Sequence, residues 1–237
     1  MPETLTACPV CTGTEISPFL NLAYYPEGMF HLCKCGAAFL NPRMTELEAI
    51  EWYRSGKYRE RTGADDIDHK DSLEQQKQRA EYIAQVPKVK IESHLDIGSS
   101  NGDLLRAIAK LNPGARSEGV DIDPVLTQDE FTVYQSIDEV PGTFDLITCI
   151  QTLEHIANPR KMVTGIYDHL NPGGAVIVEV PNRRAALFAF AAPQHVIAYD
   201  EASLRGLFIG YKAIQVSLHG YPYQSPLDLS ILLTANK

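Results

Sequence analysis

Four of the five cysteines in this 237-residue chain lie within its first 35 residues, in two close pairs. Cys8 and Cys11 are separated by two residues, and Cys33 and Cys35 by one. Two short turns that each carry two thiols can direct four sulfur atoms at one point, and Zn²⁺ takes this donor set in structural sites. The spacing therefore predicts a zinc site with these four cysteines as ligands, and the metal would supply much of the folding free energy of so short a segment. The alternative is four unrelated buried thiols.

A glycine loop follows the predicted strand 91–97 and leads directly into a predicted helix. It reads Asp96-Ile-Gly98-Ser-Ser100-Asn101-Gly102. Glycines at such a bend let the backbone turn sharply and approach a ligand closely, at the edge of an α/β sheet where ligands bind. A dinucleotide site needs the spacing G-x-G-x-x-G, whereas this loop has G-x-x-x-G.

Two acidic residues flank this loop and indicate which cofactor it binds. A carboxylate at Asp96 would repel a diphosphate but attract a cation, and S-adenosylmethionine (SAM) carries an ammonium and a sulfonium group but no phosphate. Asp121 ends the next predicted strand, about 20 residues further on, where an acid can accept hydrogen bonds from both ribose hydroxyls. We therefore expect SAM to bind here. The alternative for both acids is capping of a helix or turn.

Two histidines follow predicted strands at the same edge of the sheet. His155 follows strand 144–150, and His195 lies in the loop after strand 175–180. Methyl transfer from a sulfonium group is an in-line displacement that requires alignment and exclusion of water, and a hydroxyl or carbon-acid acceptor also needs a general base, most often histidine. His155 and His195 are therefore the predicted catalytic residues. A helix-capping or loop-fixing role is the alternative for His155.

The elements that must position these residues alternate between strand and helix from residue 91 onwards. Repeated β-α units predict a doubly wound α/β sheet. A capping box at Thr45–Glu48 predicts a preceding helix to about Tyr53, and apolar spacing predicts another over 71–86. The remaining predicted strands are 117–121, 131–134, 213–218 and 228–234, and the remaining predicted helices are 102–111, 159–170 and 202–208.

These motifs resemble those of class I SAM-dependent methyltransferases. Residues 95–102 resemble the family's first motif, with Ser100 in place of its usual middle glycine, and 119–124 resemble its ribose-binding motif. Residues 144–156 and 170–182 resemble its fourth- and fifth-strand motifs. The resemblance implies a Rossmann-like fold with a seven-stranded, mostly parallel sheet. It also implies cofactor-binding residues, which are Asp96, Gly98, Ser100, Asn101, Gly102, Asp121, Ile122, Ser136, Ile137 and Gln151.

The N-terminal segment resembles a subfamily with an N-terminal zinc-binding domain, which includes deoxysugar C-methyltransferases and enzymes of surface-polysaccharide synthesis. The cysteine pairs and residues 39–43 carry this resemblance, and Gln194-His195 resembles a segment in which that subfamily has a catalytic histidine. The chain departs from the subfamily in having Gln194 for a glutamate and Ala192 for a tyrosine. We expect the subfamily's large C-terminal domain to be absent. The implied domains are a zinc-binding ribbon (1–44), a helical connection and lid (45–90) and the methyltransferase core (91–237).

Composition excludes several classes of function. Apolar residues make up 44% of the chain and charged residues 22%, as in ordinary globular proteins. The formal net charge of -9 disfavours binding to phosphate backbones and anionic membranes. No apolar run approaches the roughly 20 residues of a membrane span, and the N-terminus lacks the features of a secretory signal, so we expect a cytoplasmic protein.

Three functions remain open at this point. The first is methyl transfer to a small-molecule acceptor, such as a sugar, a nucleotide sugar or a related secondary metabolite. The second is methylation of RNA bound by the zinc ribbon, although the first 45 residues contain only two basic residues (Lys and Arg) and three acidic ones. The third is a non-catalytic SAM-binding partner protein. The sequence leaves the acceptor atom, the oligomeric state and the identity of the metal open.

Overall fold

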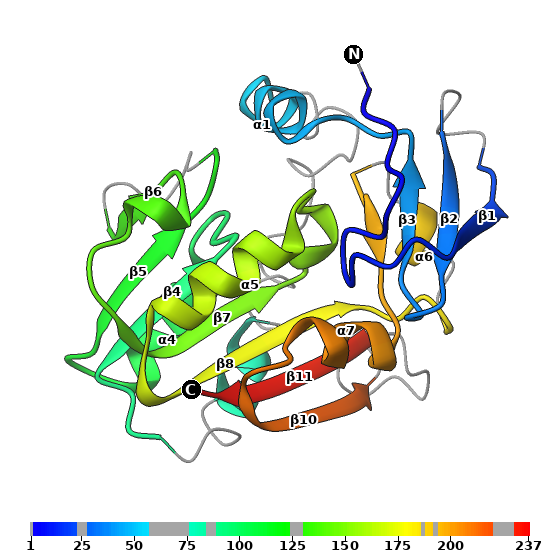
Figure 1. Cartoon of the computed structure of the whole chain (residues 1–237). Coiled ribbons are helices and arrows are strands. Elements are labelled where there is room, and N and C mark those ends of the chain that lie inside the picture. Colours follow the sequence, from blue (N-terminus) through cyan, green and yellow to red (C-terminus); the bar gives the residue numbers. More distant parts are fainter. Residues whose placement is uncertain are drawn as a thin grey trace.

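The computed structural model describes residues 2–22, 28–56, 76–83, 89–123, 130–185, 188–191, 194–219 and 230–237. Two β-sheets lie side by side in it (Figure 1). The smaller has four strands in the order β1-β2-β3-β9, and the larger has seven in the order β10-β11-β8-β7-β4-β5-β6. None of the helices in the described ranges is both long enough and apolar enough to cross a lipid bilayer.

The larger sheet confirms the predicted seven-stranded, mostly parallel architecture. Neighbouring strands from β6 to β8 pair in parallel, and β11 runs antiparallel to both β8 and β10. The strand expected at 175–180 is longer than predicted, because the Asn-Pro-Gly-Gly segment before it is itself extended and joins β8. The strands are β4 (Ser93–Ile97), β5 (Arg116–Val120), β6 (Thr132–Tyr134), β7 (Phe144–Ile150), β8 (Leu170–Pro181), β10 (Lys212–His219) and β11 (Ser230–Asn236).

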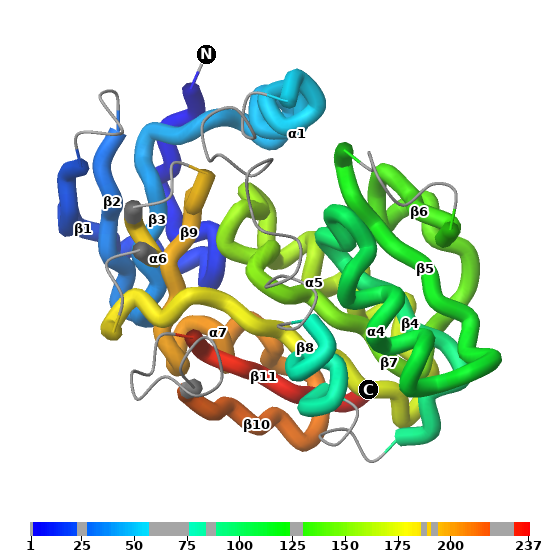
Figure 2. Tube along the Cα trace, turned by 180° about the vertical axis from the view of Figure 1, so that it is seen from behind, coloured from blue at the N-terminus to red at the C-terminus, as the bar shows by residue number. Residues whose placement is uncertain are grey.

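Helices cover both faces of this sheet, as a doubly wound fold requires (Figures 1 and 2). On one face α5 (Pro159–Asp168) and α7 (Glu201–Leu207) pack in the main apolar core. On the other face α4 (Asp103–Leu111) and the helical residues 76–83 share a second core. Side chains alternate between these cores along β7, where Leu146 belongs to the second core and Ile147 to the first. Short 3-10 turns, η2 (Ile137–Glu139) and η3 (Leu153–His155), follow β6 and β7.

The smaller sheet draws its strands from two distant parts of the chain. The strands β1 (Ile16–Leu20), β2 (Met29–Cys33) and β3 (Ala38–Asn41) come from the N-terminal segment, and β9 (Ile197–Ala198) follows the fifth strand of the larger sheet after the short helix α6 (Phe188–Ala191). Strand β9 pairs antiparallel with β3, with Phe39 opposite Ile197. The N-terminal segment is therefore completed by residues that lie far along the chain.

The second cysteine turn also docks directly on the larger domain. Gly36 has a φ of 99°, and a Cβ on it would lie 2.3 Å from Asp200 Oδ1. The Arg183 guanidinium donates one hydrogen bond to the Gly36 carbonyl and another, at 2.9 Å, to the Asp200 carboxylate. Only a residue without a side chain fits this contact, so Gly36 fixes how closely the two parts approach.

Helix α1 (Glu46–Arg54) lies near the functional edge of the larger sheet. The predicted capping box is present, since the Thr45 and Glu48 side chains each accept from the other's backbone N–H. At the far end of the helix, Arg54 donates a 2.7 Å hydrogen bond to Gln135, just after β6. The preceding residue, Tyr53, places its ring 6.2 Å from the ring of His155. The helix therefore contacts both ends of the candidate site.

Candidate functional site

The loop between β4 and α4 turns sharply and requires glycine at its start. Gly98 has a φ of 79°, and a Cβ on it would lie 2.1 Å from the Thr152 hydroxyl oxygen. Gly102, at the helix N-cap, has the same φ, and Ser100 between them has a φ of 47°. A hydrogen bond of 2.7 Å from Gly98 N–H to the Val120 carbonyl ties the loop to β5. The exposed backbone of this loop is therefore held at the carboxyl ends of β4 and β5, where ligands of open α/β sheets bind.

Asp121 fixes the turn that faces this loop. One of its carboxylate oxygens accepts a 2.8 Å hydrogen bond from the Ser100 N–H, and the other accepts one of 2.9 Å from the Asp123 N–H. The side chain thus has the turn-fixing role that was the alternative to ribose binding. Each carboxylate oxygen has a second lone pair, so Asp121 can also accept from a ligand. Ile122 follows it and is half-buried.

Asp96 is a buried carboxyl beneath the same loop. It is 3% exposed and accepts a 2.6 Å hydrogen bond from the Thr148 hydroxyl. Burial raises the pKa of Asp96 to about 7, against the opposing effects of the Thr148 hydrogen bond and the Arg79 guanidinium. A cation bound beside this carboxyl would stabilise its ionised form. His94 lies behind Thr148, with its Nε2 2.9 Å from the same hydroxyl, and burial lowers the pKa of His94 to about 3.

Gln151 is fixed by a buried ion pair on the neighbouring strand. Glu179 on β8 is fully buried and accepts hydrogen bonds from Arg79 Nη2 at 3.0 Å and from Gln151 Nε2 at 2.9 Å. The Gln151 backbone N–H also donates to the Glu179 carbonyl, and its φ is 51°. Sequence reasoning missed this pair, because Arg79 stands beside no motif and the fifth-strand motif that contains Glu179 does not show that its carboxylate pairs with a residue 100 positions away.

The remaining predicted cofactor residues lie along the same edge of the sheet in differing environments. Ser136 follows β6 and caps η2, where its hydroxyl accepts from the Asp138 N–H. The Ile137 side chain is buried in the core against Gly165, so only its backbone can meet a ligand. Asn101 exchanges two hydrogen bonds with Asp103 at the start of α4. The structure thus groups the loop residues with Asp96 and Asp121, and places Ser136 and Ile137 beyond β6.

The two predicted catalytic histidines meet, and a glutamate joins them. The rings of His155 and His195 are 4.8 Å apart. Glu154 Oε1 lies 3.8 Å from His155 Nε2 and 4.0 Å from His195 Nε2. Burial lowers the pKa of His155 to about 3 and raises that of Glu154 to about 8. Glu154 was not predicted, since an acid next to a histidine after a strand does not reveal in sequence that it will be 1% exposed.

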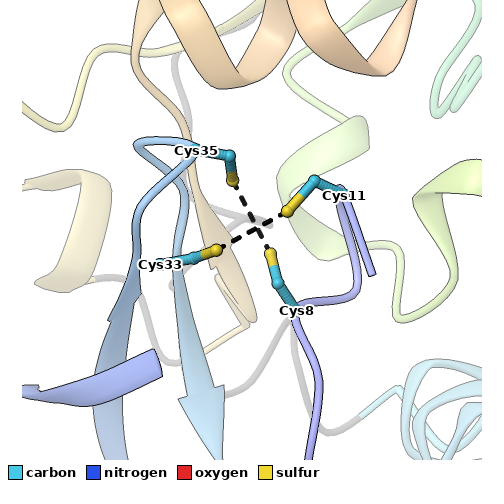
Figure 3. Close-up of side chains that lie close together, drawn as sticks. All are labelled: Cys8, Cys11, Cys33 and Cys35. Carbon is cyan, nitrogen blue, oxygen red and sulfur yellow. Dashed lines mark hydrogen bonds between the residues drawn. The ribbon is translucent and has the colours of Figure 1, made fainter. Parts of the chain in front are cut away.

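The four predicted zinc ligands also converge, as Figure 3 shows. Their sulfur atoms lie within 4.8 Å of one another, with 3.8 Å between those of Cys8 and Cys35 and 3.5 Å between those of Cys11 and Cys33. Tetrahedral zinc with Zn–S bonds of about 2.3 Å would separate its sulfur ligands by about 3.8 Å. The donor set and its spacing therefore fit zinc. Cys149 lies apart on β7 and is fully buried.

Comparisons with known proteins agree with this arrangement. A family model described as "Methyltransferase domain" matches residues 56–216. The ubiquinone biosynthesis O-methyltransferase of Xanthomonas campestris pv. campestris (strain B100) is 31% identical over 129 residues, which cover 48% of this chain and 53% of that protein. The chain therefore spans about half the length of the curated relatives it matches.

Solved structures share the fold at low sequence identity. A SAM-dependent methyltransferase from Thermotoga maritima superposes with a TM-score of 0.59 at 14% identity, over 78% of this chain and 99% of that one. The plantazolicin methyltransferase BpumL, in complex with S-adenosylhomocysteine (SAH) and a pentazolic substrate analogue, superposes with a TM-score of 0.58 at 13% identity. That superposition covers 80% of this chain and 94% of BpumL.

Proposed function

The chain belongs to the class I SAM-dependent methyltransferase family, and from this membership we propose that it methylates a hydroxyl group of a small-molecule acceptor. A sugar, a nucleotide sugar or a related secondary metabolite is the proposed acceptor class, on the resemblance of the cysteine segment. Transfer to oxygen is supported by the O-methyltransferase names of the curated relatives.

One observation supports this proposal above the others: the cofactor loop and the histidine cluster are adjacent. Thr152 packs against Gly98 in the loop, and Glu154 and His155 follow it within three residues. A donor bound over the loop would therefore lie near His155, whose ring is 4.8 Å from that of His195. That proximity is what an in-line transfer requires, because the acceptor oxygen must lie about 3 Å from the methyl carbon.

We assign the cofactor-binding roles from charge and position. Ionised Asp96 would favour the cationic methionine end of SAM, and Asp121 would accept from the ribose hydroxyls while it holds the loop. Ile122 and Ser136 would lie beside the adenine. The cofactor's positive sulfur supplies the reactive methyl group, and the chain's own residues orient it and exclude water.

The histidines would act on the acceptor. In the transfer, the acceptor oxygen forms a bond to the methyl carbon while the carbon–sulfur bond breaks, and its electron pair leaves the sulfur neutral. The acceptor hydroxyl must lose its proton as this occurs. His155 and His195 are the proposed catalytic residues, because an unprotonated imidazole at this position can promote that loss.

The four cysteines are proposed to hold a structural zinc ion. The ion would tie the N-terminal loop to the turn after β2, and so stabilise a sheet that has little core of its own. The proposed domains are a zinc-binding ribbon over 1–44, whose sheet is joined by β9 from the core, a connection and lid over 45–90, and the methyltransferase core over 91–237. The proposed partner is the small-molecule acceptor and not a nucleic acid or a membrane.

Binding and transfer test the proposal separately. We expect SAH to bind the parent protein in isothermal titration calorimetry, and an Asp121→Ala variant to bind at least tenfold more weakly. An Asp138→Ala variant is the matched control, because that carboxylate is exposed and paired only with the exposed Lys161. Transfer of a labelled methyl group is then assayed on nucleotide sugars, on small phenols and on RNA. Preference for NAD over SAH, or labelling of RNA alone, would refute the proposal.

A further inference from the structure

We propose that Glu154, His155 and His195 form a second metal site, for a divalent cation of the zinc class. Each side chain offers one ligand atom, and these three atoms lie within 4.8 Å of one another. Glu154 Oε1 is 3.8 Å from His155 Nε2 and 4.0 Å from His195 Nε2. A cation with bonds of about 2.0 Å in tetrahedral geometry separates its ligands by about 3.3 Å, so the three atoms need to approach one another by at most about 1.5 Å.

The hydrogen bonds of the two histidines prepare both rings for a metal. His155 Nδ1 lies 3.1 Å from the Gln194 carbonyl oxygen, and His195 Nδ1 lies 3.2 Å from the Ala189 carbonyl oxygen. A carbonyl oxygen can only accept, so a tautomer with the proton on Nδ1 and the lone pair on Nε2 suits both of these contacts. Metal-binding histidines in proteins are oriented in this way, with the second nitrogen donating to a carbonyl or carboxylate.

Glu154 supplies an independent reason to expect a ligand. Its side chain is 1% exposed and, within the described ranges, neither of its carboxylate oxygens has a hydrogen-bond partner. A buried carboxylate without partners is strongly unfavourable unless a cation or a proton compensates it. His155 Nε2 and His195 Nε2 lie 3.8 and 4.0 Å from this Oε1, and a ring whose proton is on Nδ1 donates none to the carboxylate through Nε2. A cation bound by the three side chains would compensate the charge of Glu154.

The donor set indicates the kind of metal and the kind of site. Two imidazole nitrogens and one carboxylate oxygen suit zinc and the neighbouring transition metals, whereas magnesium and calcium prefer oxygen alone. Three protein ligands leave at least one coordination position open, as in catalytic zinc sites, in contrast to the closed four-sulfur set of the cysteines. The two clusters would therefore differ in both chemistry and role.

The site's role, which rests on the proposed function, is to bind the acceptor oxygen in the open position. A cation held there would lower the pKa of a coordinated hydroxyl, so the acceptor would give up its proton to solvent as it binds, and the resulting oxyanion would attack the methyl group once water is excluded. The imidazoles would then act on the acceptor through the cation instead of taking its proton themselves. The cation neither gains nor loses electrons in this step.

Metal content of the folded protein tests the site without any need for activity. We expect the parent protein to bind two equivalents of Co²⁺ in place of zinc. One would have the strong thiolate-to-metal absorption of a four-cysteine site, and the other only the weak bands of nitrogen and oxygen ligands. Glu154→Gln and His195→Gln variants should bind one equivalent and keep the thiolate absorption. A His31→Gln variant is the matched control and should bind two.

The results separate this inference from the proposed function. If the parent binds one equivalent with thiolate absorption only, or if both variants still bind two, the second site is refuted. Circular dichroism and SAH titration check that the variants are folded, since Glu154→Gln removes the buried charge and keeps the size of the side chain. Methyl transfer by a parent protein that holds one equivalent would refute the second site alone. Two equivalents without transfer to any acceptor would instead count against the proposed function.

Discussion

The raised pKa of Asp96 predicts that affinity for the methyl donor rises with pH. With a pKa of about 7 in the free protein, Asp96 is ionised in about one molecule in eleven at pH 6 and in half of the molecules at pH 7. If the cationic end of SAM binds the ionised form, the association constant rises about fivefold between these two pH values. The donor's own α-amino group, with an ordinary pKa of about 7.7 to 8.0, remains charged over most of this interval.

The assay is calorimetric titration of the parent and of an Asp96→Asn variant at half-unit steps from pH 5.5 to 7. Asparagine keeps the size of the side chain and can still pair with the Thr148 hydroxyl, but it does not titrate. We expect the variant to bind SAM more weakly than the parent at pH 7, with an association constant that does not change with pH. If the parent's association constant does not change with pH, or if the variant's changes equally, Asp96 does not select the cation.

The same shift predicts a change in stability, and its sign follows from proton binding. The folded pKa lies above the ordinary value of 3.8, so between about pH 4 and 7 the folded state holds more protons than the unfolded state. The contribution of Asp96 to stability is therefore present at low pH and is lost as pH rises through 7. A shift of about three units corresponds to about 4 kcal/mol. The Asp96→Asn variant should gain stability relative to the parent by up to this amount between pH 4 and 7, as measured by urea unfolding.

Three further perturbations follow from the packing. Gly98→Ala would force a Cβ into the Thr152 side chain at a positive φ. We therefore expect the free energy of unfolding in urea to fall by roughly 2 kcal/mol and SAH binding to become unmeasurable. Gly114→Ala, with open space around it, should retain SAH binding. Burial alone would raise the pKa of Asp200, but hydrogen bonds from Ser203 and two arginines hold this pKa below its ordinary value. The stability that Asp200 provides is therefore present above the unfolded pKa and is lost on acidification. The Asp200→Asn variant should lose roughly 2 kcal/mol of unfolding free energy at pH 7 and less at pH 3. A strong chelator should expose the thiols of Cys8, Cys11, Cys33 and Cys35 to a thiol reagent, while Cys149 remains unreactive until the protein unfolds. If these four thiols react as fast before chelation as after it, they do not bind a metal.

Local patterns predict much of the larger sheet. Apolar strands between glycine and proline turns have strong signals, and the predicted bounds of β7 match the observed ones. In a parallel sheet, residues that follow the carboxyl ends of strands lie at one edge, which is why the sequence alone assigns His155 and His195 to a single site. Residues 57–75, 84–88, 124–129 and 220–229 lie outside the described residues, so the predictions that fall on them, including both ends of the helix predicted over 71–86 and the start of the strand predicted over 228–234, stay predictions.

The contacts that sequence reasoning missed are those that depend on long-range packing. The pairing of β3 with residues 197–198 joins segments about 160 residues apart. A strand of two residues is too short to show a periodic sequence pattern that would predict this pairing. The ion pair of Arg79 with Glu179 likewise spans 100 residues. Glu154 lies in the fourth-strand motif, but the motif does not show that its carboxylate is buried beside two imidazoles. Long-range burial of a charged group cannot be read from local pattern.

The two sheets are joined at the histidine cluster, which gives the cysteine segment a physical connection to the site. Val196 directly follows His195; its N–H donates to the Glu154 carbonyl at 3.0 Å, and its carbonyl accepts from the Leu40 N–H at 2.9 Å. One backbone unit thus links η3 of the larger domain to β3 of the smaller sheet. Because β3 follows directly from the turn that carries Cys33 and Cys35, an ion that orders this turn also restricts the strand on which the His195 backbone is held. Loosening of the cysteine site should therefore reach the acceptor side of the active site before it reaches the cofactor loop, whose hydrogen bonds run through β5 instead.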